Sequence, residues 1–357
     1  MTDLGYMNTK ILLKYNFALL IFFAAFASCK KKGNDGPIPQ PVETSTADVY
    51  AAGRINYIAT YWKNGNAVTL GSAGSDANGM ALLGNDIYVV GSQSTVNGNS
   101  IAKYWKNGVA VNLTDGTNYA MANDIFIVGN DVYIAGAEAK NGTTNYAAKY
   151  WKNGIPVTLT DEINARASGI AVVNNDVYVI GKRSLDGTSS IVCYWKNGQL
   201  ADLTDRNTYA TDQAITVSGN DIYMSWSATY NVYGKLQTSY SKNFGTPVTI
   251  ADGTQDARGY AIAVSGSDVY IAGSGPAANS QSISAKYWKN GNAVTLANNA
   301  NGAFALSVAI SDQDIYVAGY SQTSNGSLAT YWKNGNAVSI TDGTSDALIR
   351  KIVVVKK

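Results

Sequence analysis

Histidine is absent from the chain of 357 residues, and cysteine occurs only at Cys29 and Cys193. Without histidine the protein lacks the side chain that most often serves as a general base or a metal ligand. Cys193 therefore has no histidine to activate it, and it has no second cysteine in the same region. We expect Cys193 to be a small buried apolar residue. The sequence predicts no metal site, no cofactor and no catalytic centre of a known type.

The sequence also lacks an excess of either charge. Its 27 basic side chains nearly balance the 25 acidic ones, and they are scattered except for a lysine triplet at residues 30–32. Proteins that bind nucleic acid concentrate their basic side chains in a patch or stripe. We therefore expect no nucleic acid as a partner.

Long apolar runs are scarce, and the main one, residues 17–27, is too short to span a bilayer. Lys10 and Lys14 precede this run, and the small residue Ser28 and Cys29 follow it. A basic start, a short apolar run and small residues at its end are typical of an export signal. We expect residues 1–28 to be a signal peptide.

The segment Phe26-Ala27-Ser28-Cys29 resembles the lipobox of bacterial lipoproteins. The resemblance implies that Cys29 becomes the N-terminus and carries acyl chains, two of which anchor a protein stably in a membrane. Residues 29–47, which contain lysine, glycine and proline, predict a flexible tether. Lys30 resembles the residue found in lipoproteins sorted to the outer membrane, and the side of that membrane stays open. The alternative is an ordinary secretory signal with a chance cysteine.

A pentapeptide of the form Tyr-Trp-Lys-Asn-Gly recurs through the rest of the chain at intervals of 43 to 47 residues. One degraded copy reads Tyr240-Ser241-Lys242-Asn243-Phe244-Gly245. A period of this length with strand-like content indicates a β-propeller or a solenoid. The copies begin at Tyr61, Tyr104, Tyr150, Tyr194, Tyr240, Tyr287 and Tyr331.

One repeat, residues 257–296, predicts four short antiparallel strands. Asn290-Gly291 tolerates positive φ at both positions and predicts a two-residue type I′ hairpin between the third and fourth strands. Asp268, which recurs before the second strand of each repeat, is expected to bond its own backbone in an Asx-turn. Adjacent Tyr and Trp on the third strand point to opposite faces, which suits stacked sheets that bury both faces.

The two ends of the repeat region are complementary. The chain enters with a second strand, residues 49–53, and stops with a first strand, residues 349–355. Each kind of strand occurs seven times. We therefore predict an all-β fold over residues 48–357, a seven-bladed β-propeller of four-stranded antiparallel blades. Its ring closes when the three N-terminal strands join the C-terminal one, which leaves no free edge inside the ring.

The repeats resemble those of bacterial extracytoplasmic β-propeller lipoproteins, through the motif Asp268-Val269-Tyr270-Ile271-Ala272-Gly273 and its equivalents. The resemblance covers residues 48–357, and the lipobox adds to it. The repeats differ from WD40 repeats, whose Gly-His element needs histidine. They contain neither a sialidase Asp-box nor the tryptophan docking motif of quinoprotein dehydrogenases. The resemblance thus implies a fold and no particular activity.

Function is expected where the sevenfold pattern breaks, because residues present in every repeat are needed for structure. Polar side chains of unlike kind occupy equivalent positions in the first strands, where they converge on a concave mouth. The alternative is a water-filled channel without a ligand. The candidate binding residues at this channel mouth are Asn78, Asn123, Asp124, Arg166, Gln213, Arg258, Tyr260 and Arg350.

A second break lies between residues 209 and 250. Trp226 replaces the recurring glycine after the second strand, and Ser241 replaces the recurring tryptophan. Trp226, Tyr230 and Tyr233 predict an aromatic platform on which a sugar or a peptide stacks. The alternative is a repacked blade in which Trp226 fills the space that Ser241 leaves.

The aspartates between consecutive repeats favour Asx-turns over calcium sites. No loop supplies the alternating series of oxygen ligands that calcium loops of the EF-hand type use. These aspartates are Asp115, Asp161, Asp205, Asp252 and Asp342.

The favoured function is a non-catalytic, lipid-anchored protein of the cell envelope that binds or scaffolds a protein or a glycan. One alternative is a polysaccharide-degrading hydrolase or lyase that uses mouth carboxylates such as Asp76 or Asp124 as acid and base. The other is a structural or adhesion protein without a specific pocket.

Overall fold

The computed structural model describes residues 47–140, 143, 145–160, 164–184, 187, 189–206, 208–230, 234–253, 256–277, 282–297 and 301–357. The predicted signal peptide, Cys29 and all of the predicted tether except Ala47 lie outside these residues. The compact unit Ser45–Lys357 is the one considered below. None of the described residues belongs to a helix that could cross a membrane.

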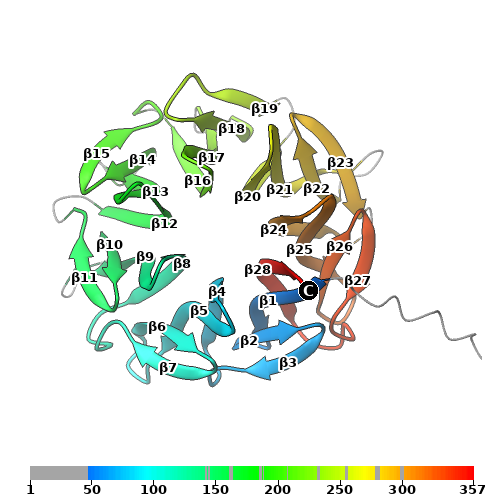
Figure 1. Cartoon of the computed structure of the whole chain (residues 1–357), viewed down its shortest axis with the longest axis horizontal. Helices are drawn as coiled ribbons and strands as arrows, with labels where there is room; N and C mark the ends of the chain where they lie inside the picture. Colours follow the sequence, from blue (N-terminus) through cyan, green and yellow to red (C-terminus); the bar gives the residue numbers. More distant parts are fainter. Residues whose placement is uncertain are drawn as a thin grey trace, which may run out of the picture. The chain divides into compact units, whose positions relative to one another are not determined.

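The described residues form strands and turns, which assemble into seven four-stranded antiparallel sheets. The sheets stand around a common axis as the blades of a propeller (Figure 1). The prediction of an all-β, seven-bladed propeller is confirmed. The strands, blade by blade from the innermost outwards, are β28 (Ala347–Lys356), β1 (Ala47–Ile55), β2 (Ile58–Lys63) and β3 (Asn66–Thr69) in blade 1; β4 (Ser75–Leu83), β5 (Asp86–Ser94), β6 (Ser100–Lys106) and β7 (Val109–Asn112) in blade 2; β8 (Ala120–Val128), β9 (Asp131–Ala139), β10 (Tyr146–Lys152) and β11 (Ile155–Thr158) in blade 3; β12 (Asn164–Val173), β13 (Asp176–Ser184), β14 (Ile191–Lys196) and β15 (Gln199–Asp202) in blade 4; β16 (Tyr209–Ser218), β17 (Asp221–Thr229), β18 (Gln237–Lys242) and β19 (Val248–Asp252) in blade 5; β20 (Arg258–Ser265), β21 (Asp268–Pro276), β22 (Ile283–Lys289) and β23 (Asn292–Ala297) in blade 6; and β24 (Ala303–Ser311), β25 (Asp314–Gln322), β26 (Ser327–Lys333) and β27 (Asn336–Ser339) in blade 7.

Blade 1 combines the two ends of the described chain. β28 pairs with β1 in an antiparallel register that places Val354 opposite Val49 and Ile352 opposite Ala51. β28 is the innermost strand of that sheet, and the first and last strands lie side by side (Figure 1). The ring therefore closes in the way that the complementary ends of the repeat region predict.

The hairpins between third and fourth strands have the backbone that their sequence predicts. Asn290 and Gly291 adopt φ values of 50° and 82°, the positive pair that a type I′ turn requires. In blade 5 Phe244 takes the second position with φ of 62° and stacks on Tyr194 at 4.6 Å between ring centroids. We call the end of the blades that carries these hairpins the turn face. The opposite end, which carries connections such as residues 95–99, is the loop face.

Each hairpin asparagine fastens the turn between the first two strands of its own blade. In blade 6 Asn290 Nδ2 donates to Asp268 Oδ1 at 2.7 Å, and Asn290 Oδ1 accepts the backbone N–H of Val269 at 2.9 Å. Hydrogen bonds from Lys289 and Asn290 hold the pKa of the Asp268 carboxyl below its usual range. The expected Asx-turn is wrong, because the aspartate bonds across to the hairpin. The same pair joins Asn64 to Asp48, Asn107 to Asp86, Asn153 to Asp131, Asn197 to Asp176, Asn243 to Asp221 and Asn334 to Asp314.

Neighbouring blades pack through the aromatic residues of the third strand. Trp151 of β10 is fully buried against Tyr88 and Val90 of blade 2. Its ring lies over the second strand of its own blade, since a Cβ added to Gly136 would meet Trp151 at 3.0 Å. The adjacent Tyr150 packs into the cluster on the other side, toward blade 4. Adjacent Tyr and Trp thus serve the two faces of a sheet that is buried on both.

The substitution Ile352→Ala in β28 should lower the free energy of unfolding by about 2–5 kcal/mol, the usual range for truncating a well-packed aliphatic side chain. Ile352 is 2% exposed and lies in the cluster between blades 7 and 1. Val355 in the same strand is 43% exposed, so Val355→Ala is a matched control expected to stay within about 0.5 kcal/mol of the parent. Urea denaturation measures both variants. Equal effects would contradict a role for β28 in closing the core.

Candidate functional site

The innermost strands bulge at equivalent positions around the axis. In blade 2 the register between β4 and β5 shifts between Ala77 and Gly79, so Asn78 has no partner on β5. The bulge brings the two backbones close together, and a Cβ added to Gly91 would lie 1.8 Å from the Asp76 carbonyl oxygen. Only glycine fits at such an approach. The equivalent bulge residues are Asn123, Ser168, Tyr260, Leu306 and Arg350.

The bulge residues surround a cavity of about 120 Å³ on the axis. Amide, hydroxyl, phenol, aliphatic and guanidinium groups all contribute to its lining, so the cavity does not share the sevenfold repetition of the blades. The structure places six of the eight predicted channel-mouth residues around it, and their role in binding stays a prediction. These six are Asn78, Asn123, Asp124, Gln213, Tyr260 and Arg350.

Several of the polar groups in the cavity wall connect one blade to the next. Asn78 Nδ2 donates to the carbonyl oxygen of Ala122 at 2.9 Å, and Asn123 makes the equivalent bond to blade 4 at 2.8 Å. Ser168 Oγ donates to Gln213 Oε1 at 2.9 Å. These bonds fix the side chains in one orientation, so the wall is preorganised for any ligand that it receives.

The two carboxylates that the sequence offers as acid and base are both engaged in ion pairs. Asp76 lies 3.0 Å from Arg54 Nη1 and 3.7 Å from Arg350 Nη2. Asp124 of blade 3 lies 3.5 Å from Lys351 Nζ of blade 1, so this contact joins two blades that are not neighbours in the ring. Both contacts hold blades together, which supports structural roles for the two carboxylates.

Arg166 and Arg258, the other two predicted mouth residues, lie outside the axial cavity. Arg166 of β12 faces a separate pocket beside β13, and its guanidinium stacks on the Tyr146 ring at 3.9 Å. Arg258 at the start of β20 is exposed and hydrogen-bonds to the side chain of Tyr260. The two arginines thus lie on the loop-face half of their innermost strands and outside the cavity lining.

Trp226 is 1% exposed and packs against Ile180 and Val192 of blade 4. In blade 4 the third-strand residue Trp195 fills the corresponding interface with blade 3, whereas blade 5 has only Ser241 at that position. A ring enclosed in this way offers no face to a ligand, so the prediction of Trp226 as part of an exposed platform is wrong. The alternative describes the structure: Trp226 fills the space that Ser241 leaves.

The tryptophan at position 226 also changes the innermost strand of its blade. The register between β16 and β17 shifts between Ala210 and Gln213, so Thr211 and Asp212 lie opposite the single residue Ser227, and the bulge is displaced from its place in the other blades. Asp212 Oδ2 is enclosed and has no hydrogen-bond partner among the described residues. Burial raises the pKa of the Asp212 carboxyl, against the opposing effects of Thr211, Arg258 and Lys182. Sequence reasoning missed Asp212, although the replacement of the recurring glycine was a signal that the bulge must differ.

The other predicted platform residues have different outcomes. Tyr230 is 45% exposed at the end of β17, and Tyr233 lies outside the described residues. The structure shows an aromatic pair that the sequence analysis missed: Phe304 and Tyr320 lie opposite each other on β24 and β25 and stack at 4.9 Å between ring centroids. The signal was that a single repeat carries aromatic residues at both of these paired positions.

Asx-turns between repeats are confirmed at two of the predicted positions. Asp115 Oδ1 accepts the backbone N–H of Thr117 at 2.9 Å, and Asp342 Oδ1 accepts that of Thr344 at 3.0 Å. In the part of the chain that the structure describes, no three acidic or cysteine side chains are placed to hold a metal ion together. Cys193 is fully buried, as expected, and burial raises the pKa of its thiol.

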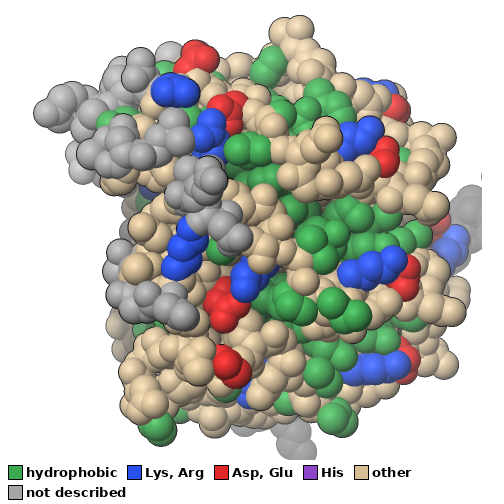
Figure 2. Space-filling model, turned by 90° about the vertical axis from the view of Figure 1, so that its left-hand side faces the viewer, with side chains coloured by type: hydrophobic (Ala, Val, Ile, Leu, Met, Phe, Trp, Pro, Cys, Tyr) green, Lys and Arg blue, Asp and Glu red, His purple; other side chains and the backbone are tan. Residues whose placement is uncertain are grey.

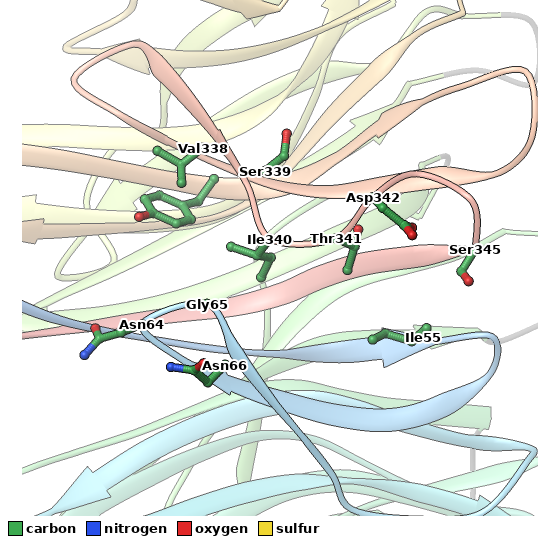
Figure 3. Close-up of a pocket in the computed structure, with 11 residues that line it drawn as sticks. Ile55, Asn64, Gly65, Asn66, Val338, Ser339, Ile340, Thr341, Asp342 and Ser345 are labelled. Atoms are coloured by element: carbon green, nitrogen blue, oxygen red, sulfur yellow. The ribbon is translucent and has the colours of Figure 1, made fainter. Parts of the chain in front are cut away.

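A groove of about 750 Å³ runs between blades 7 and 1 on the outside of the ring (Figure 3). Val338 and Ile340 line one side, and Asn64, Asn66 and Ile55 line the other (Figure 3). A comparable groove of about 540 Å³ lies between blades 5 and 6. Because the groove recurs between blades, it belongs to the repeating architecture and is a weaker candidate site than the axial cavity.

The substitution Asp212→Asn should raise the free energy of unfolding at neutral pH. Burial raises the pKa of the Asp212 carboxyl above its ordinary value of 3.8, so the ionised carboxylate destabilises the folded state above the raised pKa. As the pH falls through the raised pKa toward 3.8, the folded protein binds the proton and the advantage of the variant disappears. Urea denaturation at neutral pH and at about pH 4 measures this difference.

Asp115→Asn is the control of opposite sign. Hydrogen bonds from Thr117 lower the pKa of the Asp115 carboxyl, so this variant should be less stable than the parent at neutral pH. Its loss should disappear as the pH falls through the lowered pKa. A stability difference for Asp212→Asn that is the same at both pH values would contradict the assignment.

No model of a known protein family matches the sequence, and no curated protein of similar sequence does. Among solved structures, the chain is similar to the uncomplexed acylaminoacyl peptidase of Pyrococcus horikoshii, with 12% identity and a TM-score of 0.52 over 84% of this chain and 51% of that one. An acylaminoacyl peptidase solved with Z-Gly-Gly-Phe-chloromethyl ketone gives 11% identity and a TM-score of 0.52 over the same shares, 84% and 51%. TolB from Acinetobacter baumannii gives 10% identity and a TM-score of 0.43 over 76% of this chain and 67% of that one. The chain spans about half the length of the two peptidases, and at these identities the likeness shows the propeller fold alone.

Proposed function

We propose that this protein is a non-catalytic binding protein of the bacterial cell envelope, anchored by lipid at Cys29, that holds a glycan at the loop face around the propeller axis. The observation that carries the proposal is the contrast between the two ends of the ring. The turn face repeats one arrangement in every blade, whereas the loop-face half of the innermost strands carries a different side chain in almost every blade.

The turn face neutralises its own charge. Lys106 lies 2.8 Å from Asp86, and the equivalent lysines of blades 3 to 7 lie 2.7–3.1 Å from their aspartates. Basic side chains beside acidic ones recur along one edge of the view in Figure 2. Exposed pairs of this kind contribute little to stability individually and leave no net charge to attract a ligand. This end of the ring is therefore a poor candidate for a specific site.

The loop-face end of the axis combines the two kinds of group that sugars require. The stacked rings of Phe304 and Tyr320 offer an aromatic surface, and the amide of Asn123 and the phenol of Tyr260 line the cavity beside the axis. Aromatic rings contact the apolar face of a sugar, and planar polar side chains bond its hydroxyl groups. A protein ligand would use the same surface through different contacts, and the binding test below separates the two.

One observation favours a second candidate, a polysaccharide hydrolase. Asp212 is a half-buried carboxyl at the mouth of the axial cavity, and burial raises its pKa, which is the property of a general acid. A hydrolase needs a partner carboxylate, and the nearby Asp76 and Asp124 are engaged in ion pairs. Release of reducing sugar ends from a polysaccharide panel, abolished by Asp212→Asn, would establish this candidate in place of the first.

The substitutions Phe304→Ala and Tyr320→Ala should each weaken retention of a bound polysaccharide by about threefold to tenfold, the effect of losing one aromatic contact. Affinity electrophoresis through gels that contain soluble polysaccharides measures retention. Phe244→Gly removes an aromatic side chain from the turn face, where Phe244 is 39% exposed, and is the matched control. Retention that falls equally in Phe244→Gly, or that survives both loop-face substitutions, would overturn the proposed site.

The substitution Cys29→Ala should abolish acylation and release the protein from membranes, because no other cysteine follows an apolar run at the N-terminus. Metabolic labelling with a fatty acid and fractionation of cells measure the two effects. Cys193→Ala is the control and should leave both unchanged, since Cys193 is buried inside blade 4. Labelling that persists in Cys29→Ala would contradict the lipid anchor.

A further inference from the structure

Two basic side chains lie directly opposite each other on the loop-face half of blade 4. Arg166 of β12 and Lys182 of β13 are paired in the register of these strands. Like charges at such a position destabilise a sheet. The ion pairs on the neighbouring strands of the described chain join Lys149 to Glu138 and Arg183 to Asp202, and neither includes this pair. Among the described residues, no carboxylate forms an ion pair with either of these two adjacent cations.

The two cations face a pocket of about 290 Å³. Arg183, the third basic residue of its lining, already donates from Nε to Asp202 at 2.8 Å, so Arg166 and Lys182 are the cations left for a ligand. The other described residues of the lining contribute hydroxyl groups, an amide and a glycine. The lining residues are Asn164, Arg166, Lys182, Arg183, Ser184, Gly187, Ser189 and Ser190.

Arg166 is held in a fixed orientation by aromatic side chains. Its guanidinium stacks on the Tyr146 ring at 3.9 Å, and Tyr119 packs edge-on against Tyr146 at 6.1 Å between ring centroids. Stacking covers the face of a guanidinium and leaves its edge N–H groups, which are the ones that bind a carboxylate or a sulfate. Tyr119 is 41% exposed, so an aromatic surface lies beside the cations.

Lys182 is placed where an anion would stabilise it most. Its side chain is half-buried, and Nζ donates to the carbonyl oxygen of Ala210 at 3.3 Å. Burial and the neighbouring Arg166 both lower the pKa of Lys182, and Asp212 opposes them. A partly desolvated ammonium group beside another cation gains from an opposite charge far more than an exposed lysine does.

We propose that Arg166 and Lys182 form a subsite for the oxyanion of an acidic glycan, a carboxylate or a sulfate, while Tyr119 and Tyr146 contact its sugar ring. The inference rests on the proposed function and names the class of glycan that the loop face takes. It accounts for the like-charge pair across two strands, because the ligand supplies a counter-charge that no described residue places in contact with the pair.

Binding is tested with the full folded protein and three soluble polymers: polygalacturonate, dextran sulfate and neutral dextran. The double substitution Arg166→Gln/Lys182→Gln should reduce affinity for the acidic polymer by at least about tenfold, the effect of losing two charge-assisted contacts, and leave neutral dextran unaffected. Whichever of carboxylate and sulfate polymer loses more identifies the oxyanion. Raising the salt concentration should weaken the same binding.

The matched control is Lys152→Gln/Lys196→Gln, which removes the same net charge from the turn face, where both lysines pair with aspartate. This variant should bind the acidic polymers as the parent does. An equal loss in the control would reduce the effect to overall charge and overturn the subsite. Parent-like affinity in Arg166→Gln/Lys182→Gln would overturn it as well.

Stability gives a second measurement that does not depend on a polymer. Without ligand, Lys182→Gln should raise the melting temperature because it removes the like-charge repulsion, and a fall would show that Lys182 has a structural role instead. Sodium galacturonate should stabilise the parent and not the variant.

If galacturonate stabilises the parent through Lys182 while no polysaccharide binds, the proposed function fails and the anion subsite stands. If neutral glycans bind and acidic ones bind no better, the subsite fails alone.

Discussion

The close approach of the second strand of each blade to its innermost strand is the contact on which both the ring and its central cavity depend. In six blades a Cβ on the second-strand glycine would lie only 1.8–2.0 Å from a carbonyl oxygen of the innermost strand. That approach exists because the innermost strand bulges, and the bulge leaves one residue per blade without a partner at the axis. A Cβ added to Gly136 or Gly273 would also meet the tryptophan of the third strand, at 3.0 Å and 2.8 Å. The second-strand glycine therefore leaves room for the indole of the third strand. It also allows the close approach at which the bulge residue of the innermost strand faces the cavity.

In blade 5 a tryptophan takes the place of this glycine, and the pairing of the two inner strands changes with it. With Trp226 at the glycine position, the innermost strand still carries one extra residue, but the bulge is displaced: Gln213 pairs with Trp226, and Thr211 and Asp212 lie opposite Ser227. The indole still reaches the interface with blade 4, so packing between blades is preserved while the third strand carries only Ser241. The consequence at the axis is Asp212, an enclosed carboxyl of raised pKa at a position where other blades carry a small residue such as Ala77 or Ala122. The packing of Trp226 and the carboxyl at the cavity mouth thus belong to one local rearrangement of the blade.

The sequence predicts most of the fold because its information is local and repeated. The Asn-Gly pairs dictate hairpins through their φ preferences, and the complementary ends dictate closure through β1 and β28. It also predicts which innermost-strand residues gather at the axis, since equivalent positions in a closed ring must converge. It does not predict what depends on contacts between repeats. The orientation of Arg166 toward Tyr146 and the bond of Asp268 to Asn290 are set by neighbours that are distant in the chain or across a turn. For Trp226 the sequence left an exposed platform and a buried filler open, and the structure shows the buried one.

The turn face and the loop face differ in how their charged side chains are paired. On the turn face each lysine has an aspartate within 3.1 Å in blades 2 to 7, and in blade 1 Asp48 is met by Lys357 at 3.1 Å. Beside Lys182 the described residues form no such ion pair, and the carboxylate that opposes the lowering of its pKa is Asp212 of the next blade. A ring of seven well-packed blades tolerates this local cost without losing its fold. The pair Arg166 and Lys182 lies among unlike residues and beside the half-exposed Tyr119, and a ligand of opposite charge is the explanation that we propose for it.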